Sequence, residues 1–153
     1  MLLVACEREA PRRAGATSTV SSPDSSRPQT ARATCPATGK WSDCAVFERL
    51  DRAGLAPRRD SVPATEPPLT ISGTTLRVGT SELEIYVYPD AASRALDEAR
   101  LDRAKYLDYA APLSMQAQPT LIRSENLIAI LHSRNDHQRE RVSDALTAGP
   151  PQP

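Results

Sequence analysis

Two histidines are the residues of this chain whose chemistry is easiest to recognise, and both lie in its C-terminal part. His132 ends an apolar stretch with the pattern of a strand, and His137 follows five residues later, where a helix is expected to begin. With Asp136 they could supply two or three ligands to a metal ion, since imidazole and carboxylate groups both bind zinc. A catalytic zinc site also needs a third firm ligand and hydrogen-bonded groups around the ligands. Because the neighbouring sequence offers neither clearly, we expect surface histidines here, with no bound metal and no cofactor.

Glu82 and Glu84 form a second candidate, because residues two apart on a strand point to the same side of a sheet. Paired carboxylates perform acid–base chemistry when their environments separate their pKa values. These two lie at the start of the expected strand, on its polar face, so we expect both to be solvated. The sequence also contains no Gly-x-Ser-x-Gly, no Ser-x-x-Lys, no phosphate-binding glycine loop and no Gly-x-Gly-x-x-Gly. We therefore predict that the protein is not an enzyme.

The N-terminus carries a different kind of signal. In Leu3-Val4-Ala5-Cys6 an aliphatic residue is followed by two small or permissive residues and then by a cysteine. This string resembles the lipobox of bacterial membrane-anchored lipoproteins, and the resemblance covers only these residues and the tether that follows. It implies that residues 1–5 are the remnant of a signal peptide that begins further upstream, and that Cys6 carries lipid such as palmitate. Two or more acyl chains anchor a protein stably. The implied location is the cell membrane or outer membrane, with the protein facing the periplasm or the exterior.

Composition predicts a tether followed by one small domain. Residues 6–34 are rich in Pro, Ser and Thr and poor in aliphatic side chains, so we expect them to be disordered. The formal net charge is zero, acids and bases are interspersed, and 4% of the residues are aromatic. A nucleic-acid partner is therefore not expected. No apolar stretch reaches the roughly 18 residues that a membrane-spanning helix needs.

The three cysteines, Cys6, Cys35 and Cys44, fit an exported protein. An odd number of cysteines in such a protein needs an explanation, and lipidation of Cys6 leaves an even pair. We predict that Cys35 and Cys44, nine positions apart, form a disulfide. The alternative is a pair of free thiols in a reducing compartment.

The domain is expected over residues 35–148, and residues 149–153 form a loose tail. Within the domain we expect a disulfide-stapled helix in residues 35–56, a Pro-rich linker at 57–68 and a ββαββα unit at 69–148. The helix between the two hairpins is expected to extend from about residue 91 to 109. The run at 127–131 is apolar on both faces, which is typical of a central strand.

These elements predict an α+β fold in the order α-ββα-ββα, with a four-stranded, mostly antiparallel sheet. We expect the second and third helices to pack on one face of the sheet. The other face would carry Tyr86, Tyr88, Ile128 and Ile130. The first helix is the simplest cover for this face, and a protein partner or an apolar ligand is the alternative, because exposed apolar patches mark binding sites.

The sequence thus favours a bacterial envelope lipoprotein, with a tethered, non-enzymatic binding or structural module held to the membrane by its lipid. One alternative is a cytoplasmic regulatory or interaction protein with Met1 as its true start. A metal-dependent enzyme that uses His132, Asp136 and His137 is the third hypothesis.

Overall fold

The computed structural model describes residues 35–108 and 119–153. The predicted signal remnant, the lipidation site Cys6 and the tether lie outside these described residues. Within them, none of the helices combines the length and the apolar character that a membrane span requires.

The first helix, α1 (Asp43–Arg52), begins where the sequence predicts. Ser42 is its N-cap, and the Ser42 side-chain oxygen accepts a hydrogen bond from the Ala45 amide at 3.2 Å. This bond provides an acceptor for one of the backbone N–H groups that have no partner within the helix in its first turn. Val46 and Leu50, four residues apart, are fully buried and fix the side of the helix that packs.

A disulfide joins Cys35 to Cys44, with 5.8 Å between their Cα atoms, so the predicted pairing is present in the structure. Cys44 lies in the first turn of α1, and the bond therefore ties the segment that precedes the helix to the helix itself. A bridge across nine positions restricts the unfolded chain, which stabilises the fold by about 2–3 kcal/mol on the chain-entropy model.

Within the described residues, six strands form one sheet in the order β1-β2-β3-β6-β5-β4. All neighbouring pairs are antiparallel except β4 and β5, which are parallel. The α+β class is confirmed, and the predicted number of four strands is too low. The strands are β1 (Arg58–Ala64), β2 (Gly73–Val78), β3 (Ser81–Val87), β4 (Leu107–Asp108), β5 (Thr120–Ser124) and β6 (Leu127–His132).

Strand β1 lies where the sequence predicts a Pro-rich linker, so that prediction is wrong for the first half of residues 57–68. Arg59 pairs with Leu76 of β2, and the register then shifts before Pro63 pairs with Thr74. An edge strand tolerates proline at such an irregularity because its outer side needs no amide donors.

The second helix, α2 (Ala91–Glu98), is shorter than predicted. Asp90 caps its start by accepting a hydrogen bond from the Ser93 amide at 2.7 Å. Asp102 then acts as a second cap and accepts from the Ala104 amide at 3.2 Å, which begins the 3-10 turn η1 (Arg103–Lys105). The predicted continuous helix to residue 109 is wrong because α2 ends at Glu98, after which the Arg100 and Leu101 amides donate to carbonyl oxygens only three residues back.

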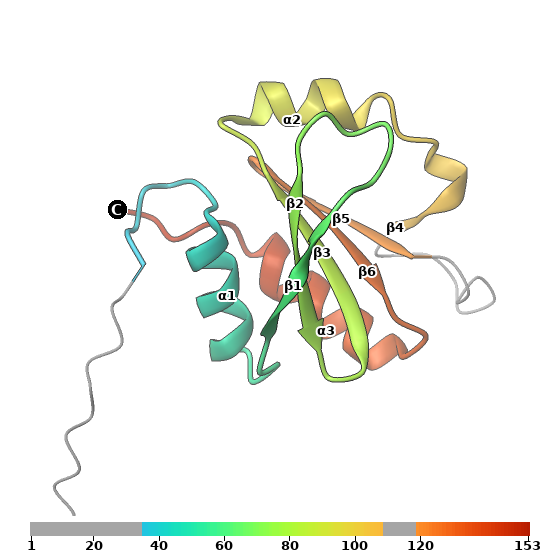
Figure 1. Ribbon diagram of the computed structural model, residues 1–153. Coiled ribbons are helices and arrows are strands. Elements are labelled where there is room, and N and C mark those ends of the chain that lie inside the picture. Colours follow the sequence, from blue (N-terminus) through green and yellow to red (C-terminus); the bar gives the residue numbers. More distant parts are fainter. Residues whose placement is uncertain (1–34, 109–118) are drawn as a thin grey trace, which may run out of the picture. The chain divides into compact units, whose positions relative to one another are not determined.

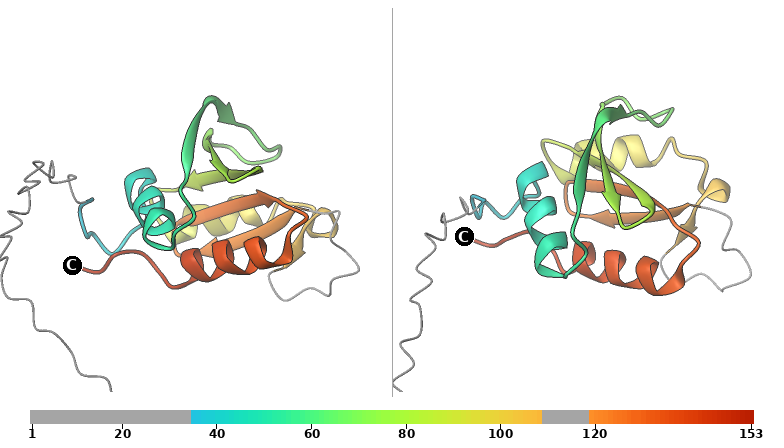
Figure 2. Two further views of the ribbon diagram at one scale, coloured as in Figure 1. Left: turned by 90° about the horizontal axis from the view of Figure 1, so that it is seen from below. Right: turned by 60° about the horizontal axis from the view of Figure 1, so that its bottom comes forward.

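The helices lie on both faces of the sheet (Figures 1 and 2). Helix α1 and the third helix, α3 (Asp136–Thr147), pack on one face, whereas α2 and the residues after it cover the other face. The prediction that the second and third helices share a face is therefore wrong. Strand parity explains the arrangement, because Leu83 and Ile85 face α1 and α3, while Tyr86 faces the opposite core.

Strand β6 is the central strand of this arrangement, as predicted. It lies between β3 and β5, and its residues 127–131 are fully buried. Its side chains alternate between the two cores, since Leu127, Ala129 and Leu131 belong to the first core and Ile128 and Ile130 to the second.

The turn between β5 and β6 contains a buried asparagine, Asn126, which is 3% exposed. Its side-chain oxygen accepts a hydrogen bond from the Trp41 amide at 2.8 Å. Its side-chain nitrogen donates to the carbonyl oxygens of Trp41 at 3.0 Å and Tyr88 at 2.7 Å. Trp41 precedes α1 and Tyr88 follows β3, so one amide group joins three segments that are far apart in the sequence.

Asn126→Ala is expected to lower the free energy of unfolding by roughly 3 kcal/mol or more, because it leaves three buried backbone groups without partners. Chemical denaturation followed by the fluorescence of Trp41, the single tryptophan, measures this loss. Asn135→Ala is the matched control, since it removes only the cap of α3 and should cost about 1 kcal/mol. Equal losses in the two variants would contradict the special role of Asn126.

Candidate functional site

The predicted ligand or partner face is closed by the chain itself. Tyr86, Tyr88, Ile128 and Ile130 are all at most 3% exposed. They form a second core that contains Ala64, Leu101, Tyr106 and Leu121, with Leu69 and Ile71 packed against it. The cover comes from the segment between β1 and β2 and from the residues after α2. The first helix is not the cover, because it packs on the opposite face.

The hydroxyl groups of three buried tyrosines each donate a hydrogen bond to a carboxylate at the border of this core. Tyr86 donates to Glu84 at 2.6 Å and Tyr88 to Asp97 at 3.1 Å. The third of these bonds, from Tyr106 to Glu66, measures 2.7 Å. Burial, together with the neighbouring carboxylate, raises the pKa of each tyrosine above its usual value. All three phenols therefore act as hydrogen-bond donors at neutral pH.

Asp97 attaches α2 to the segment between β1 and β2. Its Oδ2 accepts hydrogen bonds from the Thr70 amide at 2.8 Å, the Thr70 hydroxyl at 2.7 Å and the Tyr88 hydroxyl. Burial alone would raise the pKa of this carboxyl, but the bonds from Thr70 and Tyr88 outweigh it, and the pKa is lower than usual. Next to it, the Glu98 carboxylate accepts from Arg94, Arg103 and Arg123. These two carboxylates therefore hold the helix in place.

Asp97→Asn is expected to lower the free energy of unfolding by roughly 2 kcal/mol at pH 7, because hydrogen bonds to a charged acceptor become bonds to a neutral one. The pKa of Asp97 is lower in the folded than in the unfolded protein. Its contribution is therefore complete above the ordinary Asp pKa of about 3.9 and disappears as the pH falls through the folded-state pKa.

Unfolding midpoints of the wild type and the variant, measured from pH 7 down to pH 2, should converge at the acid end. Asp102→Asn serves as the control, because Asp102 caps η1 through one bond from the Ala104 amide and Asp and Asn cap helices about equally well. A stability difference for Asp97→Asn that stays constant over this range would contradict the role assigned to its charge.

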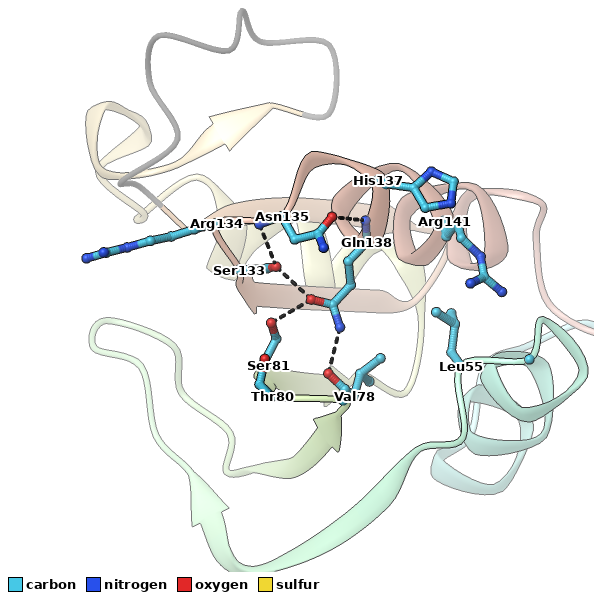
Figure 3. A pocket seen from close by; sticks show the side chains of 12 residues that line it. Leu55, Val78, Thr80, Ser81, Ser133, Arg134, Asn135, His137, Gln138 and Arg141 are labelled. Atoms are coloured by element: carbon cyan, nitrogen blue, oxygen red, sulfur yellow. Dashed lines mark hydrogen bonds between the residues drawn. The ribbon is translucent and has the colours of Figure 1, made fainter.

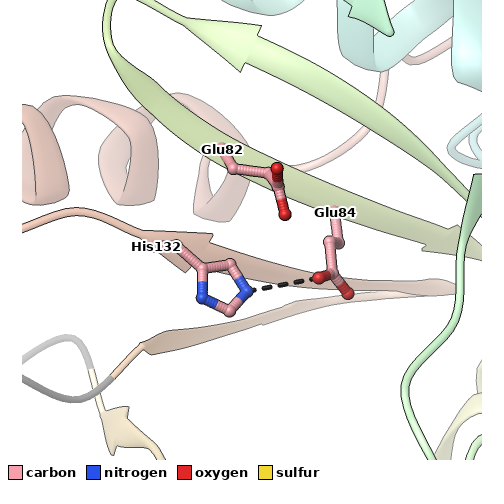
Figure 4. A group of neighbouring side chains, drawn as sticks. All are labelled: Glu82, Glu84 and His132. Atoms are coloured by element: carbon pink, nitrogen blue, oxygen red, sulfur yellow. Dashed lines mark ion pairs between the residues drawn. The ribbon is translucent and has the colours of Figure 1, made fainter. Parts of the chain in front are cut away.

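The most concentrated group of chemically capable side chains lies on β3 and β6 (Figure 4). The register places Glu82 opposite His132 and Glu84 opposite Ile130, so the two glutamates and the histidine share one face of the sheet. The imidazole Nε2 of His132 lies 3.2 Å from Oε1 of Glu84. Among the described residues, these three are the only group of at least three His, Cys, Asp or Glu side chains whose ligand atoms lie close together.

Electrostatics in this group favour positive charge. The hydrogen bond to Glu84 raises the pKa of His132, although burial opposes it, and the charges of Glu84, Glu82 and Glu66 act in the same direction as that bond. Burial raises the pKa of Glu84, but the hydrogen bonds from His132 and Tyr86 outweigh it, so that carboxyl ionises below its usual range. The pair thus places an ionised Glu84 carboxylate next to a position, now taken by the His132 imidazole, that favours a positive charge.

The metal set considered from sequence is not brought together. His137 is exposed on α3, where its Nδ1 lies 3.8 Å from a Glu140 carboxylate oxygen. Asp136 accepts a hydrogen bond from Arg139 at 2.9 Å. His132 instead faces Glu84. Alternation along β3 places Glu82 and Glu84 on the same face of the sheet, and this can be read from the sequence. That His132 lies opposite Glu82 depends on the pairing register of β3 with β6, which cannot be read from the sequence.

A groove of about 670 Å³ lies between the start of α3, the β2–β3 turn and the end of α1. At its floor the Gln138 side chain donates to the Val78 carbonyl oxygen at 2.6 Å and accepts from the hydroxyls of Ser81 and Ser133 at 2.6 and 2.7 Å (Figure 3). Both hydroxyl protons therefore point to an amide oxygen rather than to a base. We interpret the Gln138 network as a structural connection between α3 and the sheet.

No protein-family model, curated protein or solved structure matches this chain. The functional argument therefore rests on its own residues and their geometry.

Proposed function

We propose that this protein is a lipid-anchored component of a bacterial envelope, whose described domain is a non-enzymatic binding or structural module. The observation that carries the proposal is the string Leu3-Val4-Ala5-Cys6, which has the residue types of a lipidation site. In this proposal Cys6 bears the acyl chains, and the following Pro/Ser/Thr-rich residues are the tether.

The disulfide supports an oxidising location. Bonds such as Cys35–Cys44 persist in the periplasm and outside the cell, and glutathione and thioredoxin keep most cytosolic thiols reduced. A free thiol at Cys6 would be the odd cysteine of such a protein, and lipidation accounts for it.

Several polar side chains of the domain form hydrogen bonds within the domain itself, and this supports a role other than catalysis. Asp97 and Glu98 hold α2, and Gln138 connects α3 with the sheet through Ser81 and Ser133. Polar residues used in this way stabilise a surface and present it rigidly, which suits a module that is displayed for binding. A flexible tether of the length of residues 7–34 has a typical end-to-end distance of about 30 Å, enough to hold the module clear of lipid headgroups.

The anchor is tested by expressing the complete gene, with its natural upstream region, in cells supplied with labelled palmitate. The wild type should incorporate the label and sediment with membranes, and globomycin should block processing of the precursor. Cys6→Ser should lose the label and appear in the soluble fraction, because no thioether can form.

A Cys35→Ser/Cys44→Ser double variant is the matched control and should keep the label, since it removes thiols without touching the anchor. Unlabelled wild-type protein in the soluble fraction, with three reactive thiols on the native chain, would reject the proposal in favour of a cytoplasmic interaction protein.

A further inference from the structure

Three potential ligand atoms converge in the group formed by Glu82, Glu84 and His132, whereas an ion pair brings together only two groups. One ligand atom from each residue lies within 4.8 Å of the other two. All three residues lie on adjacent paired strands, with Glu82 directly opposite His132. Ligands on neighbouring strands are held by the backbone of the sheet, which is a more precise support than a loop.

We propose that Glu82, Glu84 and His132 form a binding site for a divalent transition-metal ion of the zinc type. The inference goes beyond the proposed membrane anchoring and does not depend on it.

The donor set selects the class of ion. One imidazole nitrogen with two carboxylate oxygens suits zinc and its neighbours, whereas calcium and magnesium prefer oxygen ligands alone. Three protein ligands leave a position for water or for a group from a partner. When the ion binds, the proton of His132 Nε2 that now faces Glu84 goes to solvent, and the metal takes its place between the two side chains.

The surroundings hold the ligands in the way that metal sites require. The Tyr86 hydroxyl, buried beneath the group, donates to Oε2 of Glu84 at 2.6 Å and leaves Oε1 facing His132. Arg77 contacts Glu82 at 3.1 Å and also Asp60 at 3.2 Å, so its charge is shared between two carboxylates. Such outer hydrogen bonds orient ligating carboxylates and are part of a metal site.

Charge and access both favour a cation. Three carboxylates lie around the site, those of Glu82, Glu84 and Asp60, and the guanidinium of Arg77 pairs with two of them, Glu82 and Asp60. The Glu84 side chain is 13% exposed and forms the floor, whereas the side chains of Glu82 and His132 are 37% and 42% exposed. An ion can therefore reach the group from solvent.

Zinc chloride titration of the full chain carrying Cys6→Ser tests the proposal, because this substitution removes a thiol that would itself bind zinc. The chain contains two histidines, so imidazole NMR signals report each one separately. One equivalent of zinc should shift the His132 signals and leave those of His137 in place, and calorimetry should give a single binding event. Magnesium chloride should produce neither effect.

His132→Gln and Glu84→Gln should each weaken zinc binding by at least about tenfold, whereas His137→Gln should leave it unchanged. Tyr86→Phe keeps the buried ring and removes only the hydroxyl that positions Glu84. This variant should weaken zinc about tenfold, the lower end for outer partners of metal ligands, with its near-ultraviolet circular dichroism preserved.

Three results would overturn the proposal. They are His132 signals that stay fixed through millimolar zinc, zinc affinity that survives His132→Gln, and an equal response to magnesium. Because the palmitate experiment does not involve these residues, failure of the metal site and failure of the membrane anchor are distinguishable.

Discussion

The buried amide of Asn126 is the interaction on which the arrangement of this domain depends. It bonds both backbone groups of Trp41 ahead of α1 and the carbonyl oxygen of Tyr88 after β3. The Trp41 ring belongs to the first core and the Tyr88 ring to the second, so one side chain fixes both layers at the same end of the sheet. An apolar residue could not replace it, because buried backbone groups need hydrogen-bond partners.

The second core links stability to the candidate metal site. It is the smaller core, and Tyr86, Tyr88 and Tyr106 fill much of it while their hydroxyls reach carboxylates at its border. Tyrosine is suited to such a border because its ring is apolar and its tip is polar. Tyr86 thus serves two purposes, since its ring closes the apolar face and its hydroxyl orients Glu84. The apolar face whose cover sequence analysis left open is thus the core that supports Glu84 through the Tyr86 hydroxyl.

Periodicity and capping were sufficient for much of the fold. Ser42 and Asp90 mark the starts of α1 and α2, and the unbroken apolar run of β6 identifies the central strand. Strand β1 escaped prediction because it is an edge strand whose residues are mostly exposed, so it lacks an alternating pattern. The face on which each helix packs depends on tertiary contacts, and the approach of His132 to Glu84 depends on a register between strands far apart in the sequence. Neither can be derived from local pattern.

The covalent bridge between Cys35 and α1 has a mechanical consequence. A pulling force applied on the N-terminal side of Cys35 passes through the sulfur atoms directly into the helix. Fully buried Val46 and Leu50 hold this helix in the first core, so the load reaches α1 without first passing along residues 36–42. After reduction the load would instead pass along residues 36–40 to Trp41, where Asn126 and the first core hold the chain. The oxidation state of the two cysteines therefore decides whether such a load enters the domain at α1 or at Trp41.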